Sequence, residues 1–466
     1  MQQRHSEGRQ RGSAASGRPQ RILITGASGN VGTGVLRAIT DAMPDAELVG
    51  VCRRPPRHAP WPVEWHAIDL STPAAEESLD TAMRGVDVVV HLALAVQPTR
   101  DSYYLYRANV LGSQAVFNAM RRAGVGYLIY ASSLSVYAPS GGPAVDERWP
   151  TTGQPSSTYS RHKVEVEQRL DRMAVDWPEL RQARIRPTVV VQREAAPLFR
   201  RLYLGQFVPR VAVKVLRSGV FPVMPLPAGL RLQFVHADDV GNLVVRLLRT
   251  RAEGPINVAA DPLPLPAVAG LVHARPVRVN AQVTRRVVLT LSRLGLVAVT
   301  PGWYEVATNS PLMDVSRARD ELGWTPRWSS TISALELIDG LADGAVGLTA
   351  ATGLDEEDHM RQQNVRRIHD VTLMLWAALA IVRAGGRSRP GQLDAAVVAT
   401  HLIAGTPLAV ERVRARRRDP VALLAPVAVG SALLASMRGG WAYAGCVAAL
   451  VALAAADRRS SAGEAR

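Results

Sequence analysis

The sequence predicts a doubly wound α/β fold built on a parallel sheet, followed by a separate region of apolar helices. From residue 21 to about residue 190, short apolar runs alternate with longer amphipathic runs. A glycine-rich turn at residues 25–32 follows the first apolar run, and the composition changes beyond residue 363. Strands that alternate with helices imply right-handed crossovers, and therefore a parallel sheet covered by helices on both faces.

The apolar runs are the expected strands, at residues 22–24, 47–52, 86–92, 127–131 and 183–191. The helices expected between them include residues 31–39, 109–123 and 160–174. Short strands at 232–235 and 256–259 lie in a looser, proline-rich stretch. The order of these elements predicts a dinucleotide-binding core of the Rossmann type.

The chain is expected to divide into five parts. They are a disordered polar leader (1–20), the dinucleotide-binding core (21–191), a small substrate lobe interleaved with late core elements (192–345), a Gly/Thr/acidic linker (346–363) and an apolar helical region (364–466). The 466 residues and the hydrophobic content of 47% are ample for more than one buried core.

Two stretches of the last region, 420–437 and 441–456, contain no charged residue and approach the length that crosses a bilayer. Arginine clusters flank the pair, which favours both ends in the cytoplasm. The catalytic domain is then cytoplasmic and anchored to the inner face of the cell membrane. The alternative is a soluble, alanine-rich helical bundle. Two widely separated cysteines, Cys52 and Cys446, suit a reducing compartment.

The net charge of +15 raises the question of nucleic-acid binding. The arginines are spread over chain ends and loops, and aromatic residues make up only 5% of the chain. We therefore expect no nucleic-acid partner.

The glycine-rich turn has the spacing G-x-x-G-x-x-G between a strand and a helix. Gly26 allows a sharp turn, Gly29 allows the backbone to approach a pyrophosphate, and Gly32 allows the helix to lie close to the sheet. The phosphates would bind at the positive end of the helix, beside Ser28, Asn30 and Val31.

The residues after the second strand suggest which coenzyme binds. An acidic residue there would bind the ribose hydroxyls of NAD, whereas this chain has Arg53 and Arg54. A guanidinium can pair with a 2′-phosphate, so NADP is favoured over NAD, unless both arginines are simply solvated. Asp69 and Leu70 are candidates to contact the adenine, and Ala93 to let a strand end pass close to the coenzyme.

Tyr159 and Lys163 stand one helical turn apart, and Ser133 ends a strand upstream. A phenol ionises near pH 10, and a neighbouring ammonium favours its ionised form. Tyr159 is therefore the expected acid and base, Lys163 its charged partner and a ligand of the nicotinamide ribose, and Ser133 a donor to the reacting oxygen. The alternative for the Tyr–Lys pair is an exposed pair on a helix.

These motifs together resemble the extended short-chain dehydrogenase/reductase family, the NAD-dependent epimerases/dehydratases. The resemblance covers residues 21 to about 345: TGASGNVG is similar to TGxxGxxG, and YASSLSVY and YSRHK to the serine and YxxxK segments. It implies that Asn109 orients the lysine through water and that Pro187, after Arg186, lines the nicotinamide pocket. The sequence departs from the family at Ala138 and at residues 190–192, and the sugar-nucleotide contacts of the family are not recognisable in 192–230.

The expected function is therefore a NAD(P)-dependent oxidoreductase or epimerase acting on a sugar nucleotide or an apolar ketone or alcohol. A non-catalytic NADP-binding sensor or membrane-docked scaffold is the alternative, and the intact serine, tyrosine and lysine argue against it. The other partners considered are a membrane, through the C-terminal helices, and a second copy of the chain in a homodimer.

Overall fold

The computed structural model describes residues 20–96, 101–204, 210–220, 222–227, 230–293 and 301–353. The chain divides into two compact units, Met1–Asp355 and Glu356–Arg466, and the boundary falls inside the predicted linker. The predicted apolar helices and the predicted leader up to residue 19 lie outside the described residues. None of the described helices combines the length and the apolar character that a membrane span requires.

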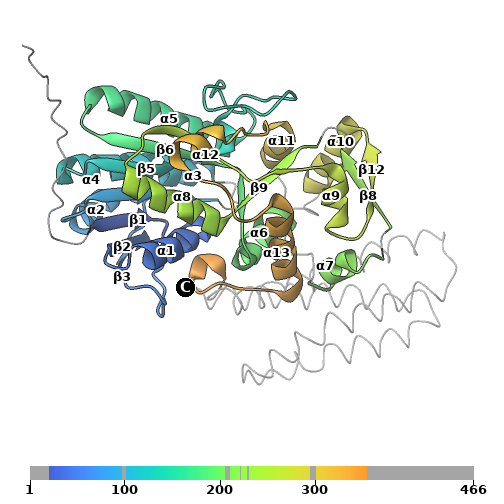
Figure 1. Cartoon of the computed structure of the whole chain (residues 1–466), viewed down its shortest axis with the longest axis horizontal. Helices are drawn as coiled ribbons and strands as arrows, with labels where there is room; N and C mark the ends of the chain where they lie inside the picture. The colour runs from blue at the N-terminus through green and yellow to red at the C-terminus, as the bar shows by residue number, and fades with distance from the viewer. Residues whose placement is uncertain are drawn as a thin grey trace, which may run out of the picture. The chain divides into compact units, whose positions relative to one another are not determined.

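A parallel seven-stranded sheet forms the centre of the first unit (Figure 1), which confirms the predicted fold class. Its strand order is β10-β6-β5-β4-β1-β2-β3, and every neighbouring pair is parallel. The strands are β1 (Arg21–Thr25), β2 (Glu47–Cys52), β3 (Val63–Ala67), β4 (Val88–His91), β5 (Tyr127–Ala131), β6 (Arg181–Pro187) and β10 (Gly254–Val258). The order reverses between β1 and β4, and ligands of such sheets bind at the carboxyl ends of the strands beside this reversal.

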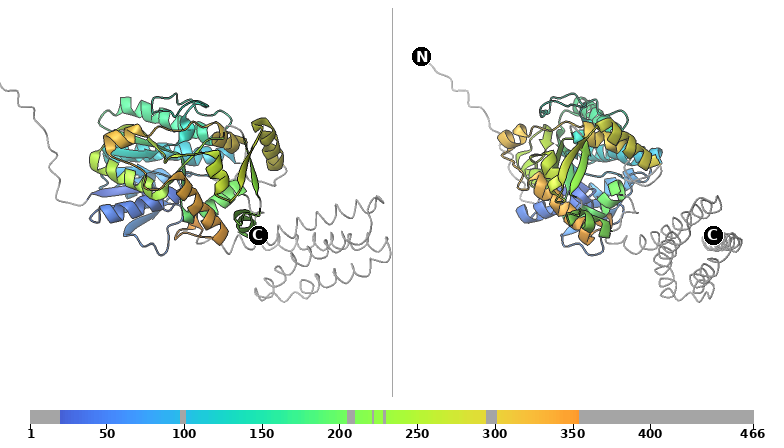
Figure 2. Two further views of the ribbon diagram at one scale, coloured as in Figure 1. Left: turned by 45° about the vertical axis from the view of Figure 1, so that its right-hand side comes forward. Right: turned by 90° about the vertical axis from the view of Figure 1, so that its right-hand side faces the viewer.

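Helices cover both faces of the sheet (Figures 1 and 2). One face carries α1 (Asn30–Ala42), α8 (Ala237–Thr250) and α12 (Ser316–Leu322), and the other carries α2 (Ala75–Ala82), α4 (Gly112–Ala123) and α5 (Thr158–Asp176). Side chains of a strand alternate between the two faces. Accordingly Ile22 and Ile24 are buried in the hydrophobic core under α1, α8 and α12, and Leu23 is buried in the core under α2, α4 and α5. The short α3 (Ser102–Tyr106) precedes a π-helical turn, Arg107–Leu111, that leads into α4.

The second lobe contains two small sheets. One is β11 (Pro262–Leu263), β9 (Leu232–His236) and β7 (Val189–Val191); the other is β12 (Arg275–Val279) and β8 (Val223–Pro227). Its helices are α6 (Ala196–Phe199), α7 (Arg210–Arg217), α9 (Leu265–Gly270), α10 (Ala281–Arg293), α11 (Pro301–Asn309) and α13 (Ser330–Asp343). Between these elements the chain returns to the main sheet through β10, α8 and α12, so the two lobes interleave.

Candidate active site

The glycine-rich turn joins β1 to α1 at the carboxyl edge of the sheet. Gly26 has a φ of +69°, and a Cβ there would lie 2.8 Å from the backbone of Ala93. A Cβ on Gly32 would lie 2.3 Å from the carbonyl oxygen of Gly26. α1 begins at Asn30 after Gly29, without a side-chain cap or an acidic residue in its first turn. The N–H groups and the positive dipole end of α1 therefore fit the pyrophosphate of a dinucleotide.

Gln192, fully buried, ties the start of α1 to the second lobe. Its Nε2 donates to the carbonyl oxygen of Asn30 at 2.8 Å and to Thr33 Oγ1 at 3.0 Å, and its Oε1 accepts from Arg37 at 2.6 Å. Asn30 Nδ2 in turn donates to the carbonyl oxygen of Val190 at 2.8 Å. In the sequence Gln192 is only a departure from the family pattern. In the structure its hydrogen bonds hold the start of α1, which follows the glycine-rich turn.

The residues proposed for the adenosine end follow neighbouring strands. Arg53 and Arg54 are exposed after β2, and Arg53 Nη1 donates to the Tyr104 hydroxyl of α3 at 2.6 Å. Asp69 follows β3, and its Oδ1 accepts from the backbone N–H and the hydroxyl of Ser71 at 2.9 and 2.8 Å. β2 and β3 run parallel, so these groups share one sheet edge. Their contact with a coenzyme stays a prediction, as does that of Leu70, whose Cβ packs against Gly112.

A series of hydrogen bonds links the carboxyl ends of β1 and β4, next to the glycine-rich turn, to Ser113 and Asn109. The Ala93 N–H donates to Thr25 Oγ1 at 3.2 Å, and Thr25 Oγ1 lies 2.6 Å from His91 Nδ1. His91 Nε2 lies 2.9 Å from Ser113 Oγ, which donates to the carbonyl oxygen of Asn109 at 2.6 Å. Burial, together with the charge of Lys163, lowers the pKa of His91 to about 3. His91 is therefore neutral, with its proton on Nε2, and acts as a fixed connector.

Asn109 lies within the π-helical turn and is buried. Its amide pairs with the backbone of Ala95: Oδ1 accepts from the N–H at 2.7 Å, and Nδ2 donates to the carbonyl oxygen at 3.1 Å. The side chain thus holds the loop after β4. The water-mediated link to Lys163 that the resemblance implies stays a prediction.

Ser133 and Tyr159 meet between the end of β5 and the start of α5. Ser133 Oγ accepts from the N–H of Ser135 at 3.1 Å and caps a short 3-10 helix. Burial raises the pKa of Tyr159 above that of an ordinary phenol, and the nearby hydroxyls of Ser133 and Ser135 oppose this rise. The two side chains that the sequence assigns to one reacting oxygen therefore lie together.

Lys163 is buried, which excludes the alternative of an exposed pair on a helix. Its Nζ donates to the carbonyl oxygen of Ala131 at 2.6 Å and lies 4.8 Å from the ring centroid of Tyr130. Burial lowers the pKa of Lys163 to about 7, and the negative charge of Glu167 opposes this shift. The ammonium of Lys163 thus lies beside Ala131, the last residue of β5, which precedes Ser133 by two positions. The lowering of the Tyr159 pKa by this ammonium stays a prediction.

An aromatic row from the second lobe covers Tyr159. The Tyr159 ring stacks on Trp303 of α11 with a centroid distance of 5.0 Å and an interplanar angle of 24°. Trp303 meets Tyr203 edge to face at 5.9 Å, and Tyr203 stacks on Phe199 at 5.4 Å. Sequence reasoning missed these three aromatic residues, because each of them lies at least forty positions from Tyr159 in the sequence.

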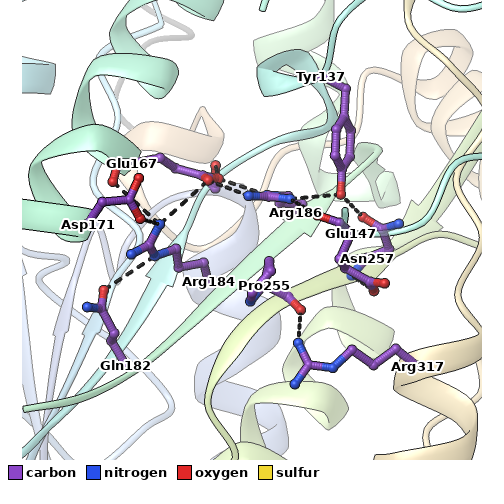
Figure 3. A network of polar contacts seen from close by, with 11 residues as sticks. Tyr137, Glu147, Glu167, Asp171, Gln182, Arg184, Arg186, Pro255, Asn257 and Arg317 are labelled. Carbon is purple, nitrogen blue, oxygen red and sulfur yellow. Dashed lines mark hydrogen bonds and ion pairs between the residues drawn. The ribbon is translucent and has the colours of Figure 1, made fainter. Parts of the chain in front are cut away.

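A buried polar network fixes α5 to the sheet (Figure 3). Arg186 of β6 donates to both carboxylate oxygens of Glu167, from Nε at 2.9 Å and from Nη2 at 2.5 Å. Ser132 Oγ also donates to Glu167, at 2.5 Å. Arg186 Nη1 donates to the Tyr137 hydroxyl at 3.0 Å, and that hydroxyl donates to Asn257 Oδ1 of β10 at 2.6 Å. Glu167 lies one turn after Lys163, and Ser132 precedes Ser133, so the network supports both side chains. Pro187, which follows Arg186, ends β6 and is buried.

We expect Lys163 to make stability depend on pH. Its folded-state pKa of about 7 lies below the unfolded value of about 10.4. Between these values the unfolded chain binds a proton that the folded protein has lost, so the free energy of unfolding rises with pH. Urea unfolding from about pH 7 to about pH 10 should show this rise in the wild type and in the exposed-lysine control Lys214→Met, and not in Lys163→Met. Parallel curves for wild type and Lys163→Met would contradict it.

The fold and the site define a dinucleotide-binding protein with a tyrosine beside a strand-end serine. Residues 22–259 match the model of the NAD dependent epimerase/dehydratase family. The chain belongs to this family, which confirms the resemblance found in the sequence.

Two curated proteins have sequences similar to parts of this chain. An uncharacterized protein of Mycobacterium tuberculosis is 28% identical over 336 residues, which cover 71% of this chain and 31% of that protein. The chain thus spans about a third of the length of this relative. A UDP-glucose 4-epimerase of Azospirillum brasilense is 31% identical over 161 residues, covering 32% of this chain and 43% of the epimerase.

Solved structures share the fold. The crystal structure of a UDP-glucose-4-epimerase from Stenotrophomonas maltophila, with bound NAD and formylated UDP-arabinopyranose, matches with a TM-score of 0.53 and 19% identity. The match covers 70% of this chain and 98% of the epimerase.

Proposed function

We propose that this protein is a NAD(P)-dependent oxidoreductase or epimerase in which Tyr159 is the acid and base. The observation that carries the proposal is the position of the buried Lys163, one turn after Tyr159 on α5, whose Nζ donates at 2.6 Å to the carbonyl oxygen of Ala131, two residues before Ser133. The start of α1, which follows the glycine-rich turn and has no side-chain cap, supports the proposal. Membership of the NAD dependent epimerase/dehydratase family supports it as well.

The three side chains have different tasks in this proposal. When bound, the nicotinamide ring supplies the acceptor or donor of the hydride that leaves or reaches the substrate carbon. Tyr159 takes the hydroxyl proton of the substrate in the oxidation and returns it in the reduction. Ser133 donates a hydrogen bond to the same oxygen. Lys163 stabilises the phenolate by its charge and holds the ribose hydroxyls of the coenzyme.

NADP is proposed as the preferred coenzyme because two arginines stand where an acidic side chain would bind the ribose of NAD. Arg53 already contacts Tyr104 and is exposed, so its guanidinium can pair with a 2′-phosphate. The solved relative from Stenotrophomonas maltophila contains NAD. The preference is therefore a specific property proposed for this chain.

The proposed substrates are a sugar nucleotide or an apolar ketone or alcohol. The rings of Trp303 and Tyr203 lie beside Tyr159, and both a sugar ring and an apolar group can pack on aromatic rings next to the reacting phenol. The solved epimerase from Stenotrophomonas maltophila, with its bound UDP-arabinopyranose derivative, favours the first class by analogy alone.

Nucleotide bound to the purified protein tests the reaction class. We expect extraction and mass analysis to find a nicotinamide dinucleotide, and titration of the emptied protein to give tighter binding of NADPH than of NADH. Tightly retained NAD would point to an epimerase cycle, in which the hydride returns to the same molecule, and freely exchanging NADP would point to a reductase. Tighter binding of NADH would contradict the coenzyme preference. A protein that neither retains nor binds either nucleotide would contradict the whole proposal.

A further inference from the structure

The end of the described chain packs directly on the coenzyme-binding turn. After α13 the backbone runs back toward α1, and the hydroxyl of Thr349 donates to the carbonyl oxygen of Ser28 at 2.6 Å. Thr349 is fully buried and Ser28 is 7% exposed. This contact joins residues that are 321 positions apart. It also lies inside the stretch predicted as a linker, whose first residues thus form part of the core.

The segment that carries Thr349 is a closed turn, residues 347–353, which we call the clamp segment. Thr352 donates from its N–H to the carbonyl oxygen of Thr349 at 3.0 Å, and its hydroxyl lies 2.8 Å from that of Thr349. The Gly347 N–H donates to the carbonyl oxygen of Thr352 at 2.9 Å. The hydroxyl of Thr349 has a single proton, so it donates to Ser28 and accepts from Thr352. The clamp segment therefore presents Thr349 as an oriented donor.

The clamp segment is itself held by the second lobe. A Cβ on Gly347 would lie 3.1 Å from Glu194 Cβ, and a Cβ on Gly353, whose φ is +109°, would lie 2.8 Å from Pro197 Cγ. Neither glycine leaves space for a side chain. The clamp segment thus packs on one side against the residues before α1 and on the other against residues 194–197, which include the first two residues of α6.

The Thr349–Ser28 hydrogen bond completes the hydrogen bonding of one peptide group in the glycine-rich turn, because both its N–H and its carbonyl oxygen are then bonded. The peptide between Ser28 and Gly29 donates its N–H to the carbonyl oxygen of Gly26 at 2.9 Å, while its carbonyl oxygen accepts from Thr349. Gly29 allows the peptide to rotate more freely than any other residue would. The orientation of this peptide fixes the start of α1, where the pyrophosphate is expected to bind.

We propose that Thr349 is a positioning residue for coenzyme binding, which holds the phosphate-binding turn in its binding geometry before the coenzyme arrives. The proposal rests on the proposed function and adds a residue from beyond the part of the chain that matches the family model. Without the Thr349 hydroxyl, the Ser28 carbonyl oxygen would be buried without a donor, and the turn would have to be ordered at the moment of binding.

Coenzyme titration of hydroxyl variants tests the proposal in the full-length protein. Thr349→Val keeps the shape of the side chain and removes the hydroxyl, and Thr349→Ala is a second removal. We expect both to raise the Kd for the coenzyme that the wild type prefers, NADPH or NADH, by about fivefold to tenfold, the equivalent of ordering one residue. Thr349→Ser keeps the donor and should bind as the wild type does. Ser333→Ala removes a buried hydroxyl without a hydrogen-bond partner and is the matched control.

Two further readouts separate positioning from a general loss of structure. Amide hydrogen exchange at residues 28–31 should speed up in nucleotide-free Thr349→Val, and exchange in β5 should stay unchanged. The substrate KM and kcat at saturating coenzyme should also stay unchanged. If the wild type binds a nicotinamide coenzyme and Thr349→Val binds it equally well, the proposal is overturned and the proposed function stands. A wild type that binds neither coenzyme overturns both.

Discussion

Replacing Tyr159 with Phe is expected to leave coenzyme binding intact and to lower turnover by about 10²- to 10⁴-fold, the usual contribution of a general acid–base residue. The substitution removes only the phenol oxygen, because the ring can keep its stacking on Trp303. The glycine-rich turn and Lys163 are untouched. The measurements are the Kd for NADPH and NADH, and the rates of UDP-galactose epimerisation and of acetophenone reduction.

Tyr127→Phe is the matched control for this loss. Tyr127 is buried, and its hydroxyl donates to the carbonyl oxygen of Ala252 at 2.6 Å at the start of β5, the opposite end of this strand from the candidate site. Its removal should cost some stability and leave turnover unchanged. Turnover of Tyr159→Phe within about twofold of the wild type would assign the proton transfer to another group, since even weak acid–base residues contribute more than this.

Local patterns were sufficient where each element carries its own signal. The strands predicted at 47–52 and 127–131 have these same bounds in β2 and β5, because each is an apolar run closed by polar or turn residues. The glycine-rich turn stands between β1 and α1 as predicted. β3 was missed, since it is an edge strand that has no buried side chain and no continuous apolar run.

Long-range contacts account for what the sequence did not reveal about the site. Trp303 reaches Tyr159 from α11, and Thr349 reaches Ser28 from beyond α13, and no periodicity or motif links residues so far apart. Gln192 could be seen in the sequence only as an unusual residue. The direction of a buried side chain is also set by tertiary packing, so the sequence could not show that Lys163 donates to the backbone of β5.

Replacing Arg186 with Met is expected to lower the free energy of unfolding by about 3–5 kcal/mol, the usual cost of leaving one charge of a buried pair alone. Both side chains of the Arg186–Glu167 pair are only 5% exposed, so the carboxylate of Glu167 would lose its hydrogen-bonded charged partner without gaining water. The remaining charge beside it would be that of Arg184, whose Nη1 lies 3.9 Å from Glu167 Oε2. Ser132 would still donate to Glu167, which offsets a small part of the loss. Urea unfolding at neutral pH measures the effect.

Three further variants, which are Arg181→Met, Glu167→Leu and the double variant Arg186→Met with Glu167→Leu, decide whether the effect comes from the unpaired charge. Arg181→Met removes an arginine from the same strand whose partner Glu253 lies 2.7 Å away, with both side chains about half exposed, and should cost no more than about 1 kcal/mol. Arg186→Met combined with Glu167→Leu removes both buried charges and should recover much of the lost stability. If the free-energy loss in the double variant equals the sum of the losses in Arg186→Met and in Glu167→Leu, the pair contributes by packing and not by charge compensation, because the free-energy changes of independent sites are additive. Glu167 accepts both from Arg186 of β6 and from Ser132, the residue before Ser133, so Arg186→Met should also lower turnover, whereas the control Arg181→Met should leave it unchanged.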